Sequence, residues 1–225
     1  RSNAPTIVFP DADLELAAQA SRSSGYAIAG QVCTSVQRLY VHESVFDRFS
    51  DLFVSLVAKL KLGNPMDEAT DVGPMLTDAA AERADRVLRN AVEAGAKVLV
   101  GGRRDGRLFQ PTVLTQVKRP MEVVCQEIFA PIVSLIPFSS RDEVIREAND
   151  SEFGLQAGIF TRDLSTAFYV ARRLRFGGVM VNDASRYRAP NQPYGGVKDS
   201  GIGREGPKYA IRELTDFKTV VFNLE

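Results

Sequence analysis

The stretch Ile132-Val-Ser-Leu-Ile-Pro-Phe138, followed by Arg141–Asn149 and Ala157–Phe160, carries the pattern that decides the fold. The first run is short and almost entirely apolar, which is typical of a buried strand. The second is charged with a spaced set of apolar residues, typical of a helix, and the third is again a short apolar strand. A helix over Leu164–Leu174 and a strand over Gly178–Asn182 continue the order. Strands that alternate with helices predict an α/β domain with a mainly parallel sheet.

The same alternation extends toward the N-terminus. Further strands are predicted over Thr6–Phe9, Arg38–Val41, Lys97–Val100 and Phe109–Val117. Further helices are predicted over Leu14–Ala29, from Ser44 to before Gly63, and from Thr77 to Gly95, with Asp11 or Asp13, the pair Ser44 and Asp47, and Thr77 as capping residues. Parallel sheets are covered on both faces. We therefore expect an open, mainly parallel sheet with helices on both faces.

The last apolar run, Phe217-Lys-Thr-Val-Val-Phe222, is predicted to be a C-terminal strand for oligomerisation. It follows a long loop and a short helix, and no strand of the chain is left to pair with it. An unpaired apolar strand is a liability in a monomer. We therefore divide the chain into a domain over residues 1–214 and an oligomerisation strand over residues 215–225, and expect self-association as a dimer or tetramer.

The overall composition excludes several classes of partner. The 28 Lys and Arg residues balance the 28 Asp and Glu residues, so no basic surface for nucleic acid is predicted. No apolar run reaches about 18 residues, so no membrane span is expected. Two widely separated cysteines and one histidine predict neither a disulfide framework nor a metal site, and they fit a reducing, cytoplasmic location.

Cys33 is the candidate for chemistry. It lies in Tyr26-Ala-Ile-Ala-Gly-Gln-Val-Cys33, at a junction between a helix and a strand, where a backbone turn can present a thiolate near main-chain N–H groups. Gly30 is expected to let the backbone approach whatever the sulfur attacks. The alternative is a small buried hydrophobic side chain. Cys125, which follows Val123 and Val124 in an apolar patch, is expected to be inert packing.

Four motifs in order give a resemblance to the aldehyde dehydrogenase superfamily. Gly30-Gln-Val-Cys33-Thr resembles its active-site cysteine signature, and Gln126-Glu-Ile-Phe-Ala-Pro131 resembles its E-E-I-F-G-P segment. Pro193-Tyr-Gly-Gly-Val-Lys-Asp-Ser-Gly-Ile-Gly-Arg-Glu205 resembles P-F-G-G-x-K-x-S-G-x-G-R-E, and Asn3-Ala-Pro5 resembles the end of E-L-G-G-N-A-P. Members of this family are about twice as long and carry a Rossmann-type cofactor half, whose G-x-G-x-x-G motif is not found here. We expect the chain to be the C-terminal catalytic half.

The resemblance implies oxidation of an aldehyde to a carboxylic acid. In the family, the cysteine that matches Cys33 attacks the aldehyde, hydride passes to NAD or NADP, and water releases the acid from a thioester. The resemblance gives the Cys33 N–H one half of the oxyanion site. The other donor, an asparagine, and the general base belong to the part that is not matched here. We therefore expect no dehydrogenase turnover from these 225 residues alone.

Two further residues take a role from the resemblance. The glutamate that matches Glu127 hydrogen-bonds the nicotinamide ribose, and the phenylalanine that matches Phe129 packs near the nicotinamide. The alternatives are a solvated loop carboxylate and a core aromatic. Ala130 departs from the family glycine and is expected to stiffen or slightly move this loop.

The stretch Asn182-Asp-Ala-Ser-Arg-Tyr-Arg188 matches the substrate mouth of the family. Ser185, Arg186 and Arg188 are therefore candidate substrate-binding residues, because guanidinium groups suit an anionic or hydroxylated aldehyde. Plain surface arginines are the alternative. Members that accept phosphate or phosphonate tend to have an arginine directly before the cysteine, and Val32 stands there, which argues against a strongly anionic substrate.

Other functions stay open on the sequence alone. A non-catalytic assembly or substrate-binding module would have an unreactive Cys33. A thiol hydrolase would need His42 beside Cys33, and the predicted strand places His42 at its far end. The glycine-rich stretch Pro193–Glu205 lacks the helix start and spacing of a phosphate-binding loop, so we expect it to close the floor of the active site.

Overall fold

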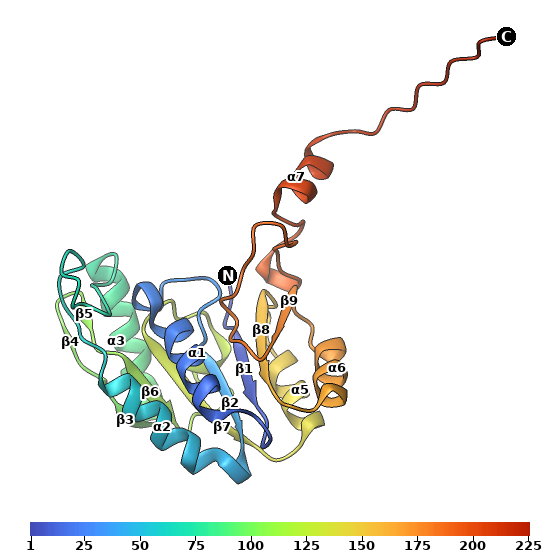
Figure 1. Cartoon of the computed structure of the whole chain (residues 1–225). Helices are drawn as coiled ribbons and strands as arrows, with labels where there is room; N and C mark the ends of the chain where they lie inside the picture. The colour runs from blue at the N-terminus through green and yellow to red at the C-terminus, as the bar shows by residue number, and fades with distance from the viewer.

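One seven-stranded sheet runs through the centre of the computed structural model, which describes all residues 1–225 (Figure 1). Its strands are β1 (Pro5–Val8), β2 (Arg38–His42), β3 (Lys97–Val100), β6 (Thr112–Thr115), β7 (Ile132–Phe138), β8 (Gln156–Phe160) and β9 (Gly178–Val181). They lie in the order β3-β6-β7-β2-β1-β8-β9, and only the edge pair β3–β6 is antiparallel. The short strands β4 (Arg104–Asp105) and β5 (Leu108–Phe109) form a separate hairpin. The expected mainly parallel α/β sheet is confirmed.

Helices cover both faces of the sheet, as expected. On one face lie α1 (Leu14–Tyr26), α2 (Phe46–Ala58) and α3 (Asp78–Glu93), and on the other lie α5 (Arg141–Asn149) and α6 (Leu164–Arg173) (Figure 1). Side chains alternate along each strand, so Leu39 and Val41 join the first core while Tyr40 joins the second. The first core, with 33 buried residues against 11, is the larger and contains the elements that lead into the cysteine. No helix has the length and apolar character needed to cross a membrane.

Helix boundaries follow local hydrogen bonding at each end. Asp13 and Thr77 cap α1 and α3 by accepting backbone N–H bonds, as predicted. The capping pair Ser44 and Asp47 is wrong, because a 3₁₀ turn over Glu43–Val45 comes first and the His42 ring accepts the Ser44 N–H. α2 therefore begins one residue later than a helix capped by Ser44 would, at Phe46.

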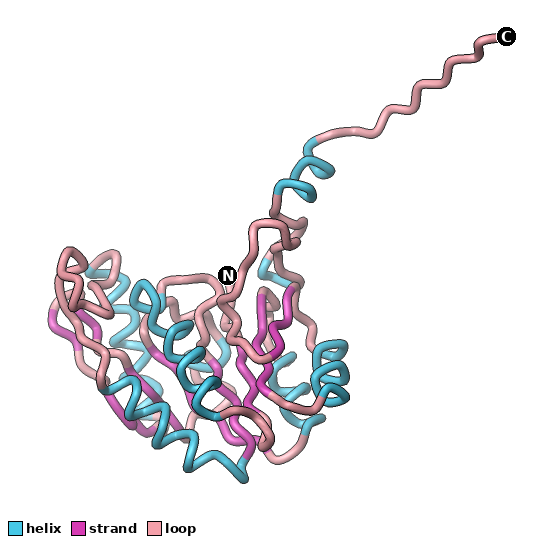
Figure 2. The backbone as a smooth tube through the Cα atoms, in the orientation of Figure 1, coloured by secondary structure: helices cyan, strands magenta, loops and turns pink.

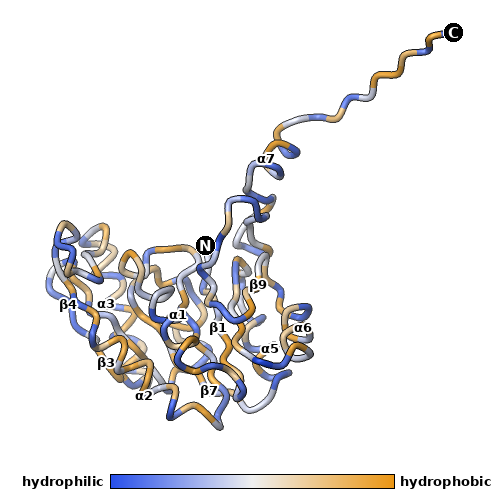
Figure 3. Tube along the Cα trace, viewed as in Figure 1, coloured by the Kyte–Doolittle hydropathy of each residue, from blue (hydrophilic) through white to orange (hydrophobic).

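Within the single chain the C-terminal segment has no partner strand, so its predicted pairing with a second copy stays a prediction. Two helices are short: α4 (Glu122–Cys125), which precedes β7, and α7 (Pro207–Leu214). After α7, residues 215–225 project from the body as an extended chain (Figure 2). A strand needs a neighbour to receive its backbone hydrogen bonds. This single chain offers none to that segment. Its apolar side chains are consequently exposed, and Phe217 and Leu224 are each 92% exposed. Figure 3 shows the hydrophobic stretches of this projecting segment in orange.

Candidate active site

Three loops converge at the amino-terminal edge of the sheet. Cys33 precedes β2, Glu127 precedes β7 and Ser2 precedes β1. Because these strands are parallel neighbours, their starting ends share one edge. A fourth segment, which follows β9, reaches the site from the opposite end of the sheet. Asn182 adopts a left-handed backbone (φ 56°) after β9, and the chain then doubles back along β8 through an antiparallel bridge between Ile159 and Asp183.

The turn that presents Cys33 has a left-handed backbone. α1 ends at Tyr26, earlier than the predicted Ala29, and Ile28, Ala29 and Gly30 follow with φ values of 52°, 54° and 69°. At Gly30 a Cβ atom would overlap the carbonyl of Ala130. From the sequence, Gly30 is expected to let the backbone approach whatever the sulfur attacks. The structure corrects this, because the glycine allows close packing of the cysteine turn on the segment that contains Glu127.

Hydrogen bonds on both sides fix the cysteine turn. The Ser35 N–H donates to the Val32 carbonyl at 2.9 Å, and the Ser185 hydroxyl donates to the Thr34 carbonyl at 2.7 Å. The N–H of Cys33 itself donates to no protein acceptor. A fixed turn with an unused N–H beside a nucleophile is suited to receive a developing oxyanion.

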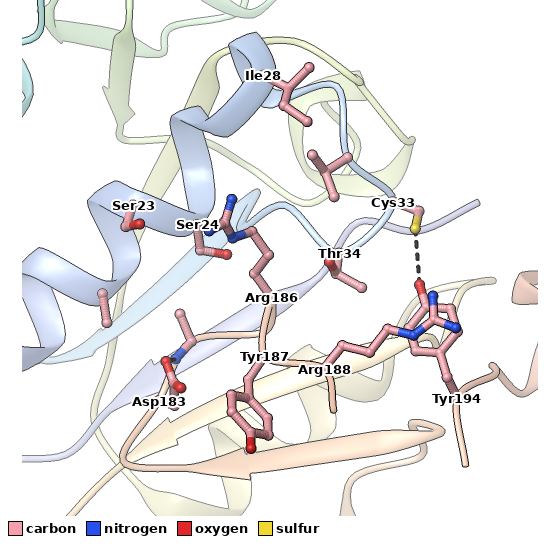
Figure 4. A pocket seen from close by; sticks show the side chains of 13 residues that line it. Ser23, Ser24, Ile28, Cys33, Thr34, Asp183, Arg186, Tyr187, Arg188 and Tyr194 are labelled. Atoms are coloured by element: carbon pink, nitrogen blue, oxygen red, sulfur yellow. Dashed lines mark hydrogen bonds between the residues drawn. The ribbon is translucent and has the colours of Figure 1, made fainter. Parts of the chain in front are cut away.

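The Cys33 sulfur faces the hydroxyl of Tyr194 at 3.0 Å (Figure 4). Tyr194 is buried, and the guanidinium of Arg188 lies over its ring, 4.0 Å from the centroid. Arg188 also pairs with Glu205 at 2.9 Å. Burial raises the pKa of the Tyr194 phenol above its ordinary value, and the Cys33 sulfur adds to the rise while the Arg188 cation opposes it. The phenol therefore keeps its proton over the physiological pH range.

Cys33 and Tyr194 stand between two cavities. One has a volume of about 580 Å³ and is lined also by Arg186, Arg188 and Ser24 (Figure 4). The other, of about 410 Å³, is bounded by the glycine-rich segment around Gly201. The sulfur is thus partly accessible and not sealed in the core. An organic substrate of a few carbon atoms fits either volume.

Glu127 and Phe129 lie on the loop that Gly30 contacts. The Ser2 N–H donates to Glu127 Oε1 at 2.7 Å, and Oε2 has no protein partner. Phe129 has a left-handed backbone (φ 55°) and is 41% exposed, so it is not a core aromatic. Gln37 ties this loop to the start of β2, since its amide group bonds the backbone of Val123, Gln126 and Ile128.

The cationic side chains of the glycine-rich segment donate hydrogen bonds to main-chain carbonyls. The Lys198 amine donates to the carbonyls of Asn149, Ser151 and Phe153 at 2.8–3.3 Å. Arg204 donates to two carbonyls of its own segment. Burial lowers the pKa of Lys198. These contacts make the segment a structural floor and leave no free lysine for a phosphate group.

The three candidate substrate residues separate in the structure. Arg186 and Arg188 line the 580 Å³ cavity. Ser185 does not, because it is fully buried and its hydroxyl donates to the Thr34 carbonyl, so this cavity gives its predicted contact with substrate no support. A serine on the other wall was missed. The Ser24 side chain lines the cavity, is 2% exposed, and its hydroxyl has no hydrogen-bond partner.

Tyr194 was also missed by sequence reasoning, although one signal was present. It stands where the resembled motif P-F-G-G has phenylalanine, so a hydroxyl is added at a position beside the floor of the site. His42, in contrast, is bonded to Ser44 and packs edge-on to Phe138 at the far end of β2. Cys33 and His42 therefore do not form a dyad. The structure also gathers no group of three or more His, Cys, Asp or Glu side chains arranged to hold a metal ion.

Comparison with known proteins places this site in a family. The model of the aldehyde dehydrogenase family matches residues 2–220. The 3-sulfolactaldehyde dehydrogenase of Priestia aryabhattai is 50% identical over 223 residues, covering 99% of this chain and 47% of that protein. The lactaldehyde dehydrogenase of Methanocaldococcus jannaschii is 44% identical, with coverages of 97% and 47%.

A solved structure agrees with these relatives. The crystal structure of glyceraldehyde-3-phosphate dehydrogenase GapN from Methanocaldococcus jannaschii, complexed with NADP, superposes with a TM-score of 0.95 at 44% identity. The match covers 97% of this chain and 48% of that one. The chain thus spans about half the length of the curated relatives it matches. With a family model along nearly its whole length and relatives at these identities, the chain belongs to the aldehyde dehydrogenase family.

Proposed function

We propose that this chain is the catalytic half of an NAD(P)-dependent aldehyde dehydrogenase, with Cys33 as the nucleophile. The observation that carries the proposal is the placement of the Cys33 sulfur, which opens to two cavities and stands on a fixed turn beside an unused N–H. As a thiolate, the sulfur forms a bond to the aldehyde carbon while the carbonyl electron pair moves to oxygen. The Cys33 N–H stabilises that oxygen.

The residues present fit part of a nicotinamide cofactor. Glu127 Oε2 is free to accept a ribose hydroxyl, and the exposed ring of Phe129 offers an apolar face. When bound, the cofactor supplies the two-electron oxidant that turns the covalent adduct into a thioester. The remaining contacts to the cofactor, and the base that activates water, are assigned to the half that the relatives have in addition. We therefore expect no NAD-linked turnover from these residues alone.

The first test compares the two thiols. Iodoacetamide is expected to alkylate Cys33 at least about tenfold faster than Cys125 at pH 7, as followed by mass spectrometry of each cysteine peptide. Both cysteines are free and half-buried. The Cys125 thiol, however, donates to the Pro120 carbonyl at 3.7 Å, whereas the Cys33 sulfur faces a hydroxyl and opens to two cavities. Equal rates for the two thiols would count against a nucleophilic Cys33.

We also propose that the substrate is a small aldehyde with a hydroxyl or acidic group at its other end. Arg186 is exposed, lines the 580 Å³ cavity and forms no ion pair within the chain, whereas Arg188 is already paired with Glu205. Ser24, whose buried hydroxyl has no hydrogen-bond partner, lines the same cavity. The relatives named above act on 3-sulfolactaldehyde and lactaldehyde according to their names. Val32, directly before Cys33, adds no further positive charge to the site, which favours a substrate with no more than one acidic group.

Arg186→Ala is expected to raise KM for an acidic aldehyde about ten- to hundredfold, since hydrogen bonds to charged groups contribute about 1.5 to 3 kcal/mol. KM for an uncharged aldehyde of similar size is expected to stay within about twofold. The measurement is steady-state kinetics of the full-length protein. Arg162→Ala is the matched control, because Arg162 lies beyond the opposite end of β8, near Asp13. A similar loss for both aldehydes would contradict the assignment.

Self-association and location complete the proposal. The exposed apolar segment 215–225 is assigned to pairing with a second copy, as a dimer or tetramer, because β9 has a strand on only one side and the segment has none. The two free cysteines support a reducing compartment, for which we propose the cytoplasm.

A further inference from the structure

A tyrosine hydroxyl is the polar side-chain group that contacts the Cys33 sulfur. The separation of 3.0 Å between Sγ and the phenol oxygen is short for a hydrogen bond to sulfur. The two residues are 161 positions apart, and no other side chain of the chain hydrogen-bonds the sulfur. Tyr194 is 9% exposed as a whole, and it lines both cavities together with Cys33.

The direction of this bond depends on the charge of the sulfur. When Cys33 is a thiol, its S–H is a weak donor and either atom can donate. When Cys33 is a thiolate, only the phenol carries a proton to donate, and bonds to an ionised acceptor are about twice as strong as neutral ones. The bond therefore stabilises the thiolate more than the thiol.

We propose that Tyr194 is a catalytic residue that donates a hydrogen bond from its hydroxyl to the Cys33 thiolate and so holds the nucleophile ionised and aimed between the two cavities. The proposal rests on the proposed function of Cys33 and adds to it the group that prepares the sulfur. No proton is transferred in this role. The phenol stays protonated while the thiolate electron pair attacks the carbonyl carbon.

The charged groups around the pair act in known directions. Arg188 lies over the ring and draws electron density from the phenol, which strengthens the hydroxyl as a donor. Glu205 partly offsets that cation through its ion pair. Arg186 and Asp183 line the cavity on the substrate side. Arg1, Arg204 and Glu213 line the cavity on the other side, and Arg204 is bonded to carbonyls of its own segment.

The test is the pH dependence of Cys33 alkylation by iodoacetamide in this chain and in its Tyr194→Phe variant, which lacks one oxygen atom. The midpoint of this profile is the pH at which Cys33 reacts at half its maximal rate. Loss of a hydrogen bond to a charged acceptor is expected to raise this midpoint by about one pH unit. A thiolate that has lost a donor is also more nucleophilic, by about threefold per unit. The two profiles are therefore expected to cross. The variant reacts about threefold slower at low pH and about threefold faster at high pH.

Two controls separate this role from a structural one. Tyr187→Phe removes a hydroxyl from the same cavity without touching the sulfur and is expected to leave the Cys33 profile unchanged. Cys125 serves as an internal reference, since a loosened fold would speed its alkylation as well. If that happens, Tyr194→Met repeats the measurement as a second variant without the hydroxyl.

An unchanged midpoint in the Tyr194 variants, or an equal shift in Tyr187→Phe, would overturn the role of Tyr194. Such a result leaves the proposed function intact as long as Cys33 still reacts faster than Cys125. The proposed function fails in a different way, if Cys33 and Cys125 react alike in the unchanged chain.

Discussion

Cys33→Ala is expected to lower aldehyde oxidation by the full-length protein at least about 10⁴-fold, because removal of a catalytic nucleophile leaves only binding and oxyanion contributions. The second thiol of this chain is not placed to replace it. Cys125 lines a separate cavity of about 130 Å³ with Arg38 and Arg119, away from the turn that presents Cys33. The readout is the rate of NADH or NADPH formation at saturating aldehyde.

The matched control for this variant is Cys125→Ala, which is expected to keep kcat within about twofold. Binding of the cofactor is measured in both variants, because Cys33→Ala removes only a sulfur atom and does not touch Glu127 or Phe129. A Cys33→Ala protein that binds cofactor and still oxidises aldehyde at more than about 1% of the original rate would sink the nucleophile assignment.

The sequence alone predicts the regular elements well, because each strand and helix carries its own periodicity. The run Ile132–Phe138 and the helix over Arg141–Asn149 have the bounds that the pattern predicts. Their apolar faces and the Ser140 capping box are local signals that tertiary packing does not override. The convergence of Cys33 and Glu127 at one edge then follows from parallel strand order.

The contacts of the site were less accessible to sequence reasoning, because they join distant segments. Tyr194 reaches Cys33 only after the chain reverses at Asn182 and passes over the sheet edge. Nothing local to Ser185 shows that its hydroxyl is used by Thr34. The predicted strand Phe217–Phe222 has the right composition but needs a neighbour that the single chain does not contain.

Gly30→Ala is expected to destabilise the chain by about 2 to 5 kcal/mol. An alanine at φ 69° costs about 1 to 2 kcal/mol from the left-handed backbone. Its methyl group would in addition overlap the carbonyl of Ala130 and lie 2.9 Å from the nitrogen of Pro131, and forced overpacking costs about 1 to 3 kcal/mol more. Both obstacles are backbone atoms, which cannot rotate away as a side chain can. Denaturant unfolding measures the change.

Gly106→Ala isolates the second contribution. Gly106 also has a left-handed backbone, at φ 54°, but a Cβ atom there meets nothing within 4 Å, so its expected cost is only about 1 to 2 kcal/mol. The excess of Gly30→Ala over Gly106→Ala therefore measures the close approach of the cysteine turn to the Glu127 loop. Equal costs would mean that these two loops separate freely. In that case Cys33 and Glu127 would not be held in one geometry, and the packing argument for a shared site would fail.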